Sequence, residues 1–117
     1  MREHIVHGCW PLILALALVL IPALAGAESD KPSPARQNEI LYLLKHDCGS
    51  CHGMTLKGGL GPSLHPDVIG ERSDGLLIET ILNGRPGTPM APWRISLNED
   101  EARWLVQRLK EGIDDTD

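Results

Sequence analysis

The sequence predicts a small all-α domain of three to four helices. Three segments, at 36–47, 73–83 and 98–112, repeat apolar residues at helical spacing. Glycine- and proline-rich stretches separate these segments and cannot continue a long helix. The chain has 117 residues, contains no phenylalanine and is 3% aromatic. Because so small a domain has little core and lacks bulky fillers, we expect a group other than side chains to complete that core.

Residues 1–27 are predicted to be an export signal. Arg2 precedes a long apolar run, and small residues follow the run. We expect cleavage after Ala27, with Ala25 as the alternative site. An uncleaved membrane anchor is the competing interpretation, although the run is shorter than the ~20 residues that span a bilayer. Residues 28–35 then form a flexible or extended lead-in.

The domain itself is expected over residues 36–112. Its first helix, 36–47, runs directly into Cys48. Glycines and prolines then predict a wrapping loop over 53–74. The segment 85–93 follows the second helix and is expected to be irregular, because its three prolines restrict the backbone.

The second and last helices have clear end signals. Ser73 or Asp74 is a good N-cap for the helix that stops at Asn83-Gly84. Asn98 caps the last helix, with Glu101 as its capping-box partner. That helix has an apolar stripe and should end near Gly112. Residues 113–117 are left as an acidic tail.

The segment Cys48-Gly49-Ser50-Cys51-His52 carries the chemistry. Two cysteines separated by two residues can bond the two vinyl groups of a haem, while the histidine that follows faces the iron. Cys9 falls within the export signal, so Cys48 and Cys51 are the only cysteines of the exported chain. Free thiols normally become disulfides outside the cytoplasm. The sequence therefore predicts one covalently attached haem c.

Three other interpretations of the two cysteines compete with haem attachment. A zinc site would need two further ligands, and neither His46 nor His65 belongs to a second pair with suitable spacing. A thioredoxin-like redox pair would follow a strand, whereas here a helix comes first. A plain structural disulfide would leave His52 without a role.

Met90 is the favoured sixth ligand of the iron. Met54 lies only two residues beyond His52 and cannot reach the opposite face of a haem, so packing or loop surface is its expected role. Met90 is far enough along the chain, in a proline-rich loop, to reach that face. His65 and an open, gas-binding iron are the alternatives.

Pro62 is the candidate partner for the second ring nitrogen of His52. A metal-bound histidine needs an acceptor there, since that hydrogen bond fixes the orientation of the ring. The carbonyl of Pro62 is suitable because Gly61 lets the backbone approach closely. The alternative is that Pro62 only shapes a turn.

The formal net charge is −5 at pH 7, which disfavours nucleic-acid binding. Four basic residues nevertheless fall in loops expected around the haem: Lys57, Arg72, Arg85 and Arg94. One interpretation is a locally basic rim that orients a redox partner. The other is scattered solvated charge.

In this order of motifs the chain resembles the single-haem class I cytochrome c fold over most of residues 36–112. More narrowly, residues 47–53, 56–62 and 84–90, together with Trp93, resemble the small NirC-type (cytochrome c55X-like) cytochromes c. That family is associated with the haem-c, haem-d nitrite reductase of denitrifying bacteria. The resemblance implies an all-α fold wrapped around one haem.

The family's site residues carry over to Cys48 and Cys51 as attachment points, His52 and Met90 as axial ligands, and Pro62 as the supporting carbonyl. Ala91 departs from the family, which usually has a proline directly after the methionine. This departure puts the rigidity of the loop in doubt, although prolines still flank the ligand.

The resemblance also implies a periplasmic, monomeric electron carrier that reduces the nitrite reductase. A haem iron with two protein ligands has no open position, so we expect no enzyme activity. We expect membrane contact only through the uncleaved precursor. Two alternatives stay open. The chain is an electron acceptor or binding helper in maturation of the d-type haem, or it is a haem-based ligand-binding sensor.

Overall fold

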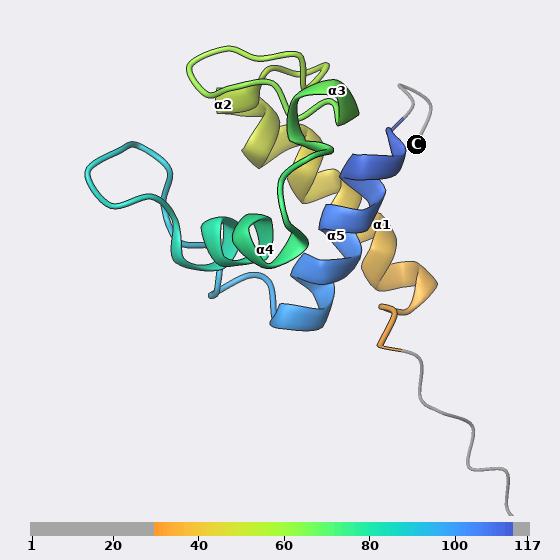
Figure 1. The fold of residues 1–117 in the computed structure, drawn as a ribbon. Helices are drawn as coiled ribbons and strands as arrows, with labels where there is room; N and C mark the ends of the chain where they lie inside the picture. Colours follow the sequence, from red (N-terminus) through yellow and green to blue (C-terminus); the bar gives the residue numbers. More distant parts are fainter. Residues whose placement is uncertain (1–29, 114–117) are drawn as a thin grey trace, which may run out of the picture.

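The computed structural model describes residues 30–113, so the predictions for the export signal at 1–27 and for most of the acidic tail lie outside the described residues. Within this range every regular element is helical, as the predicted all-α class requires. In the described part of the chain, a continuous helical run, one short helix and two longer helices make up the fold (Figure 1). No helix in residues 30–113 has the length and apolar character to cross a membrane.

Helix α1 (Pro34–Leu43) begins earlier than the predicted start at residue 36. Its first two residues therefore belong to the segment 28–35 that was expected to be a flexible or extended lead-in. The backbone N–H of Arg36 donates to the Ser33 hydroxyl at 3.3 Å, which caps the helix. Proline is well suited to the first helical position, because its missing N–H has no partner there.

The helical run continues beyond α1 through η1 (Leu44–Cys48) and α2 (Gly49–His52). In η1 the backbone is π-helical: the N–H of Gly49 donates to the carbonyl of Leu44, five residues earlier. The run ends at Gly53, whose φ of 89° favours glycine. All five residues of the cysteine motif therefore lie in the last helical turns, whereas the predicted helix stopped just before Cys48.

The wrapping loop predicted over 53–74 contains the short helix α3 (Pro66–Ile69). Pro66 occupies the first turn of α3, where proline is tolerated. A residue that breaks most helices thus starts this one. The preceding residues, 53–65, are irregular, as predicted.

Helices α4 (Asp74–Asn83) and α5 (Glu99–Glu111) lie where the sequence predicts them. The Ser73 hydroxyl accepts the first hydrogen bond of α4 at 3.3 Å. At the start of α5, Asn98 Oδ1 accepts from the N–H of Glu101, and Glu101 Oε2 accepts from the N–H of Asn98, both at 2.9 Å. The predicted capping box is therefore complete.

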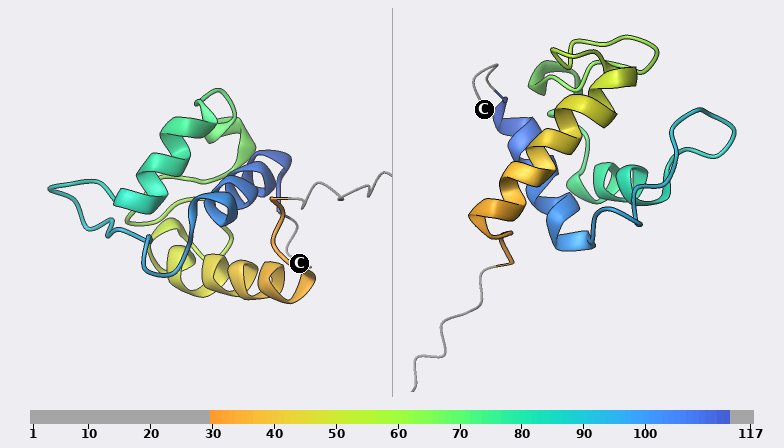
Figure 2. Two further views of the ribbon diagram at one scale, coloured as in Figure 1. Left: turned by 90° about the horizontal axis from the view of Figure 1, so that it is seen from below. Right: turned by 180° about the vertical axis from the view of Figure 1, so that it is seen from behind.

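Helix α5 is the central support of the fold. Both α3 and α4 pack against it. It crosses α1 in Figure 1 and in the right view of Figure 2, and lies beside α1 in the left view of Figure 2. Arg36 of α1 holds Glu101 of α5 through two hydrogen bonds, of 2.6 and 3.2 Å. The helix that carries the cysteine motif and the helix that precedes the methionine loop are thus both fixed to α5.

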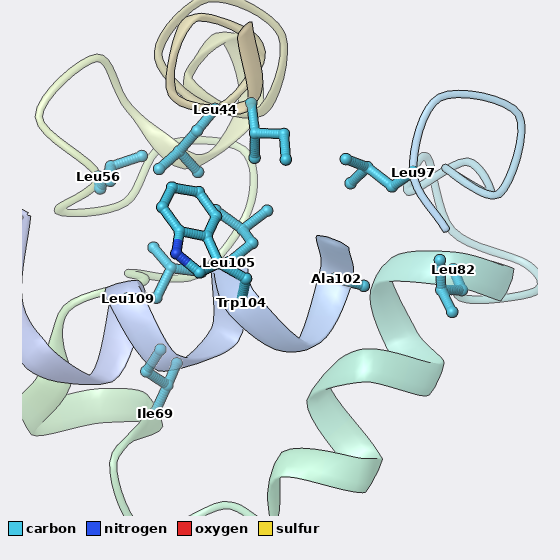
Figure 3. Packing of buried hydrophobic residues seen from close by; sticks show 10 residues of the cluster. Leu44, Leu56, Ile69, Leu82, Leu97, Ala102, Trp104, Leu105 and Leu109 are labelled. Atoms are coloured by element: carbon cyan, nitrogen blue, oxygen red, sulfur yellow. The ribbon is translucent and has the colours of Figure 1, made fainter. Parts of the chain in front are cut away.

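The buried core is centred on one face of α5. The residues that α5 buries are Ala102, Trp104, Leu105, Val106 and Leu109. Figure 3 shows Trp104 among side chains from the motif helix and the loop after it, and shows Ala102 facing α4. The predicted apolar stripe of α5 consists of Ala102, Leu105, Val106 and Leu109, and all four are buried. Trp104 lies outside that stripe and is buried as well.

Candidate functional site

The cysteine motif lies on the last turns of a helix and faces the following loop. Cys48 closes η1, and Cys51 and His52 end α2. Both thiols are free and half-buried. Residues three apart on a helix lie on the same face, so the two sulfur atoms are presented together. Ser50, between them, is exposed and donates its hydroxyl to the carbonyl of Asp47 at 2.7 Å.

His52 is buried, and its ring is held by a single carbonyl. Its Nδ1 lies 2.7 Å from the Pro62 oxygen, the partner expected from the sequence. Because a carbonyl only accepts hydrogen bonds, Nδ1 carries the proton and the lone pair is on Nε2. No described residue is hydrogen-bonded to Nε2, so this nitrogen is available to a metal.

Glycine at position 61 allows this contact. A Cβ there would lie 2.8 Å from both Cε1 and Nδ1 of His52, closer than real Cβ contacts come. The backbone also ties the loop to the motif: the N–H of Gly61 donates to Cys51 O, and the N–H of Gly58 donates to His52 O, both at 2.8 Å. The position of the Pro62 carbonyl is therefore fixed by the loop as a whole.

The electrostatics of Cys48 differ from those of a redox-active thiol. Burial, followed by the neighbouring Asp47 carboxylate, raises the pKa of the Cys48 thiol to about 11. The thiol therefore stays protonated at neutral pH. Redox-active Cys-x-x-Cys pairs have a lowered pKa instead, so the thioredoxin-like interpretation gains no support here.

Met90 lies in a separate loop that projects from the end of α4 (left in Figure 1). The loop is closed at its base: the N–H of Arg85 donates to Met90 O at 3.1 Å, and the N–H of Trp93 donates to Ile81 O at 3.1 Å. Gly84 starts the loop with a φ of 69°, and a Cβ there would meet Met90 O at 2.6 Å. Met90 is half-buried and makes no hydrogen bond to the cysteine motif within the described residues.

Met54, expected to be packing or loop surface, and His65, the alternative ligand, both lie close to the loop after the cysteine motif. The Met54 sulfur lies 3.5 Å from where a Cβ on Gly49 would stand, so Met54 stays beside the cysteine motif, and 56% of it is exposed. His65 Nε2 lies 3.0 Å from the Thr55 carbonyl within its own loop. The ring of His65 is thus engaged with its own loop.

The residues present fit a covalently bound haem. Two free thiols lie on one helix face, and the adjacent imidazole has one nitrogen hydrogen-bonded and the other available. Apolar side chains that are only partly buried border the core and can cover an apolar ring: Leu41, Leu64, Leu77, Ile78, Ile81 and Trp93. The zinc alternative has less to support it, since no three His, Cys, Asp or Glu side chains in residues 30–113 are grouped to hold a metal ion.

A cavity of about 360 Å³ lies elsewhere, between α4 and the start of α5. None of the residues predicted to attach the haem, bind its iron or support His52 lines it. Its arginines are engaged with protein groups: Arg103 pairs with Glu99 at 3.1 Å, and Arg94 donates to Asn83 at 3.1 Å. The cavity therefore lacks the donor set of the cysteine motif and is not a candidate for the cofactor.

Sequence reasoning missed one residue of the methionine loop. Thr88 accepts the N–H of Met90 and donates to the carbonyl of Arg85, so it bonds to the backbone on both sides. A threonine two residues before Met90, between Gly87 and Pro89, is a recognisable turn signal. Its contact with Arg85, however, depends on how the loop closes.

Comparison with known proteins shows that the chain is similar to c-type cytochromes. The family model described as "Cytochrome C oxidase, cbb3-type, subunit III" matches residues 35–107. Cytochrome c55X of Pseudomonas aeruginosa is 48% identical over 111 residues, which are 95% of this chain and 91% of that protein. Dihydro-heme d1 dehydrogenase of the same organism is 32% identical over 97 residues, which are 83% of this chain and 18% of that protein.

The fold is also similar to that of a solved structure. The structure of "c-type cytochrome NirC" aligns with a TM-score of 0.67 and 50% sequence identity, and the match covers 68% of this chain and 94% of that chain. The matched part of the dehydrogenase is a small fraction of that protein, whereas the cytochrome matches extend over nearly their full length.

Proposed function

This chain belongs to the cytochrome c55X family of c-type cytochromes, which carry haem c, and from that premise we propose that it transfers single electrons in the periplasm to a haem-c, haem-d nitrite reductase. The observation that carries the proposal is the Nδ1 contact of His52 with Pro62, at 2.7 Å. It leaves Nε2 facing away from the supporting carbonyl, as an axial ligand requires.

Each site residue has a defined part in the proposal. Cys48 and Cys51 would attach the cofactor, and His52 and Met90 would hold its iron. The haem supplies the one-electron couple, and thioether ligation shifts that couple toward the reduced state. Two protein ligands leave no position for a substrate, so the proposed role is that of an electron carrier without catalysis of its own.

The proposed docking surface is formed by the exposed basic residues of the loops. Lys57, Arg72, Arg85 and Arg94 are all exposed, and they lie in segments before α3, before α4 and after α4. A carrier must meet its partner quickly and leave again, which favours a small interface steered by charge. We propose that an acidic surface on the partner binds there.

Export, cleavage after residue 27 or 25, and a monomeric state are parts of the same proposal. The apolar N-terminal run supports export. The attachment of haem to paired cysteines is also consistent with a compartment in which free thiols would otherwise be oxidised.

A second candidate function is maturation of the d-type haem. It is favoured by the similarity to part of dihydro-heme d1 dehydrogenase, whose name describes oxidation of a dihydro-haem d1. If a cytochrome portion serves that enzyme, a separate cytochrome of the same kind is suited to accept the electrons released. The two candidate functions differ in the direction of electron flow, out of this chain in the first and into it in the second.

The proposal is tested first on the purified protein from cells able to attach haem. We expect haem that resists acid-acetone extraction, and a ferric spectrum with the weak long-wavelength band of methionine ligation. Met90→Ala should abolish that band while haem stays attached. Met54→Ala is the matched control and should keep the band. Covalent haem without the band in the unaltered protein would favour the sensor interpretation.

The partner is tested by rapid mixing. The reduced protein is mixed with oxidised nitrite reductase, and the oxidised protein is mixed with the dehydrogenase and its dihydro-haem substrate. Fast oxidation in the first mixture supports the carrier function. Fast reduction of this protein in the second mixture, without oxidation of it in the first, would replace the carrier function with the maturation function. Covalent attachment is tested separately with the double variant Cys48→Ala, Cys51→Ala. This variant should release its haem on denaturation.

A further inference from the structure

The loop that carries Met90 is closed by hydrogen bonds within itself. The Thr88 hydroxyl donates to the carbonyl of Arg85 at 2.6 Å and accepts the N–H of Met90 at 3.3 Å. The N–H of Thr88 also donates to Arg85 O at 3.1 Å, and the N–H of Arg85 donates to Met90 O at 3.1 Å. One side chain therefore joins the start of the loop to its methionine.

Few backbone donors are left to share this task. Proline occupies positions 86, 89 and 92, and proline has no N–H. The residue directly after the methionine is Ala91, so no proline restricts the backbone at that point. A hydroxyl that both donates and accepts replaces part of the bonding that the prolines remove.

We propose that Thr88 is the positioning residue for the sixth ligand, setting how readily the Met90 sulfur leaves the iron. The inference rests on the proposed function in which Met90 is that ligand. For the sulfur to leave, the loop must open. Opening separates the N–H of Met90 from the Thr88 hydroxyl and Met90 O from the N–H of Arg85. Without the hydroxyl, only the second of these bonds resists opening.

The experiment measures how fast imidazole replaces the methionine in the ferric, haem-loaded protein. Thr88→Val keeps the shape of the side chain and removes both hydroxyl bonds, while Thr88→Ser keeps the hydroxyl. Thr80→Val is the matched control, because the Thr80 hydroxyl also donates to a backbone carbonyl, that of Leu76 at 2.7 Å, but lies in α4 outside the loop.

We expect Thr88→Val to speed imidazole binding about five- to tenfold. A tenfold change corresponds to about 1.4 kcal/mol, which is in the range of one to two net hydrogen bonds. Thr88→Ser and Thr80→Val should stay close to the unaltered rate. Thr88→Val should also weaken the long-wavelength band and lower the reduction potential, since a less stable thioether bond favours the reduced iron less.

A second variant, Thr88→Ala, removes the hydroxyl with less bulk, and circular dichroism of both variants checks that the fold is kept. Unaltered imidazole rates in Thr88→Val and Thr88→Ala, with the methionine band present, would overturn the role of Thr88 and leave the Met90 assignment intact. If the unaltered protein instead binds imidazole as fast as Met90→Ala does, the assignment of Met90 itself is wrong, and the inference falls with it.

Discussion

Replacing Glu101 by glutamine removes the charge of one carboxylate while keeping its shape. In the native protein Glu101 Oε1 accepts from Arg36 Nε at 2.6 Å, and Oε2 accepts from a second guanidinium nitrogen at 3.2 Å. The amide oxygen of glutamine can still accept from the N–H of Asn98, so the capping box is retained. The substitution therefore isolates the ion pair between α1 and α5.

The magnitude follows from the exposure of the pair. Hydrogen bonds to charged groups contribute about 1.5–3 kcal/mol when buried, and exposed ion pairs about 0–1 kcal/mol. Glu101 has a side-chain exposure of 14% and Arg36 one of 35%, so the pair lies between these cases. We expect Glu101→Gln to reduce the free energy of unfolding by about 1–2 kcal/mol at neutral pH.

The loss should depend on pH in one direction. The hydrogen bond from Arg36 holds the pKa of the Glu101 carboxyl below its usual value. A carboxyl with a lowered folded pKa stabilises the fold above its unfolded pKa of about 4.3, and this stabilisation disappears as pH falls through the folded pKa. The difference between the native protein and Glu101→Gln should therefore shrink in acid.

The assay is urea unfolding of the haem-loaded protein, followed by far-ultraviolet circular dichroism at neutral and at acid pH. Glu39→Gln is the matched control, because Glu39 pairs with the same Arg36 at 2.8 Å but has a side-chain exposure of 65%. The control should cost less than about 0.5 kcal/mol. Equal losses from both substitutions, or a Glu101→Gln penalty that persists unchanged in acid, would refute the reasoning.

Three further predictions concern the site, the core and the docking surface. Gly61→Ala should weaken the hydrogen bond to His52 and make the reduction potential more positive, since the ring becomes a poorer donor to iron; Gly75→Ala, with open space at its Cβ, should leave the potential unchanged in the same redox titration. Leu105→Ala should cost about 2–5 kcal/mol in urea unfolding, and a loss below about 1 kcal/mol would contradict its placement in the core. Reduction of the partner should slow severalfold between low and physiological ionic strength, where the Debye length is about 8 Å; a rate independent of salt would contradict a basic docking surface.

The last two helices could be predicted because their ends are encoded locally. Asn98 and Glu101 lie three residues apart, and the side chain of each accepts a hydrogen bond from the backbone N–H of the other. These bonds do not depend on the rest of the fold. The start of α1 was misplaced because Pro34 is compatible with both an extended lead-in and a first helical turn. The same ambiguity at Pro66 concealed α3.

The parts of the site were predictable to different degrees for a similar reason. The spacing of Cys48, Cys51 and His52 is a local pattern, so its chemistry can be read from the sequence. The contact of His52 with Pro62 joins residues ten apart, and the Gly-Pro pair indicates it. The bonds of Thr88 depend on the path of a loop with three prolines, and the burial of Trp104 depends on what surrounds α5. Neither has a periodic signal in the sequence.

Helix α5 connects the two sides of the proposed iron site without contributing a ligand. Through the Arg36–Glu101 pair and the packing around Trp104, it fixes the helical run that ends in His52. Through its packing against α4, it also fixes the base of the loop that presents Met90. The separation of the two proposed ligands is therefore set by a third element. A change that shifts α5 should alter both ligands together, whereas changes at Gly61 or Thr88 should alter one ligand at a time.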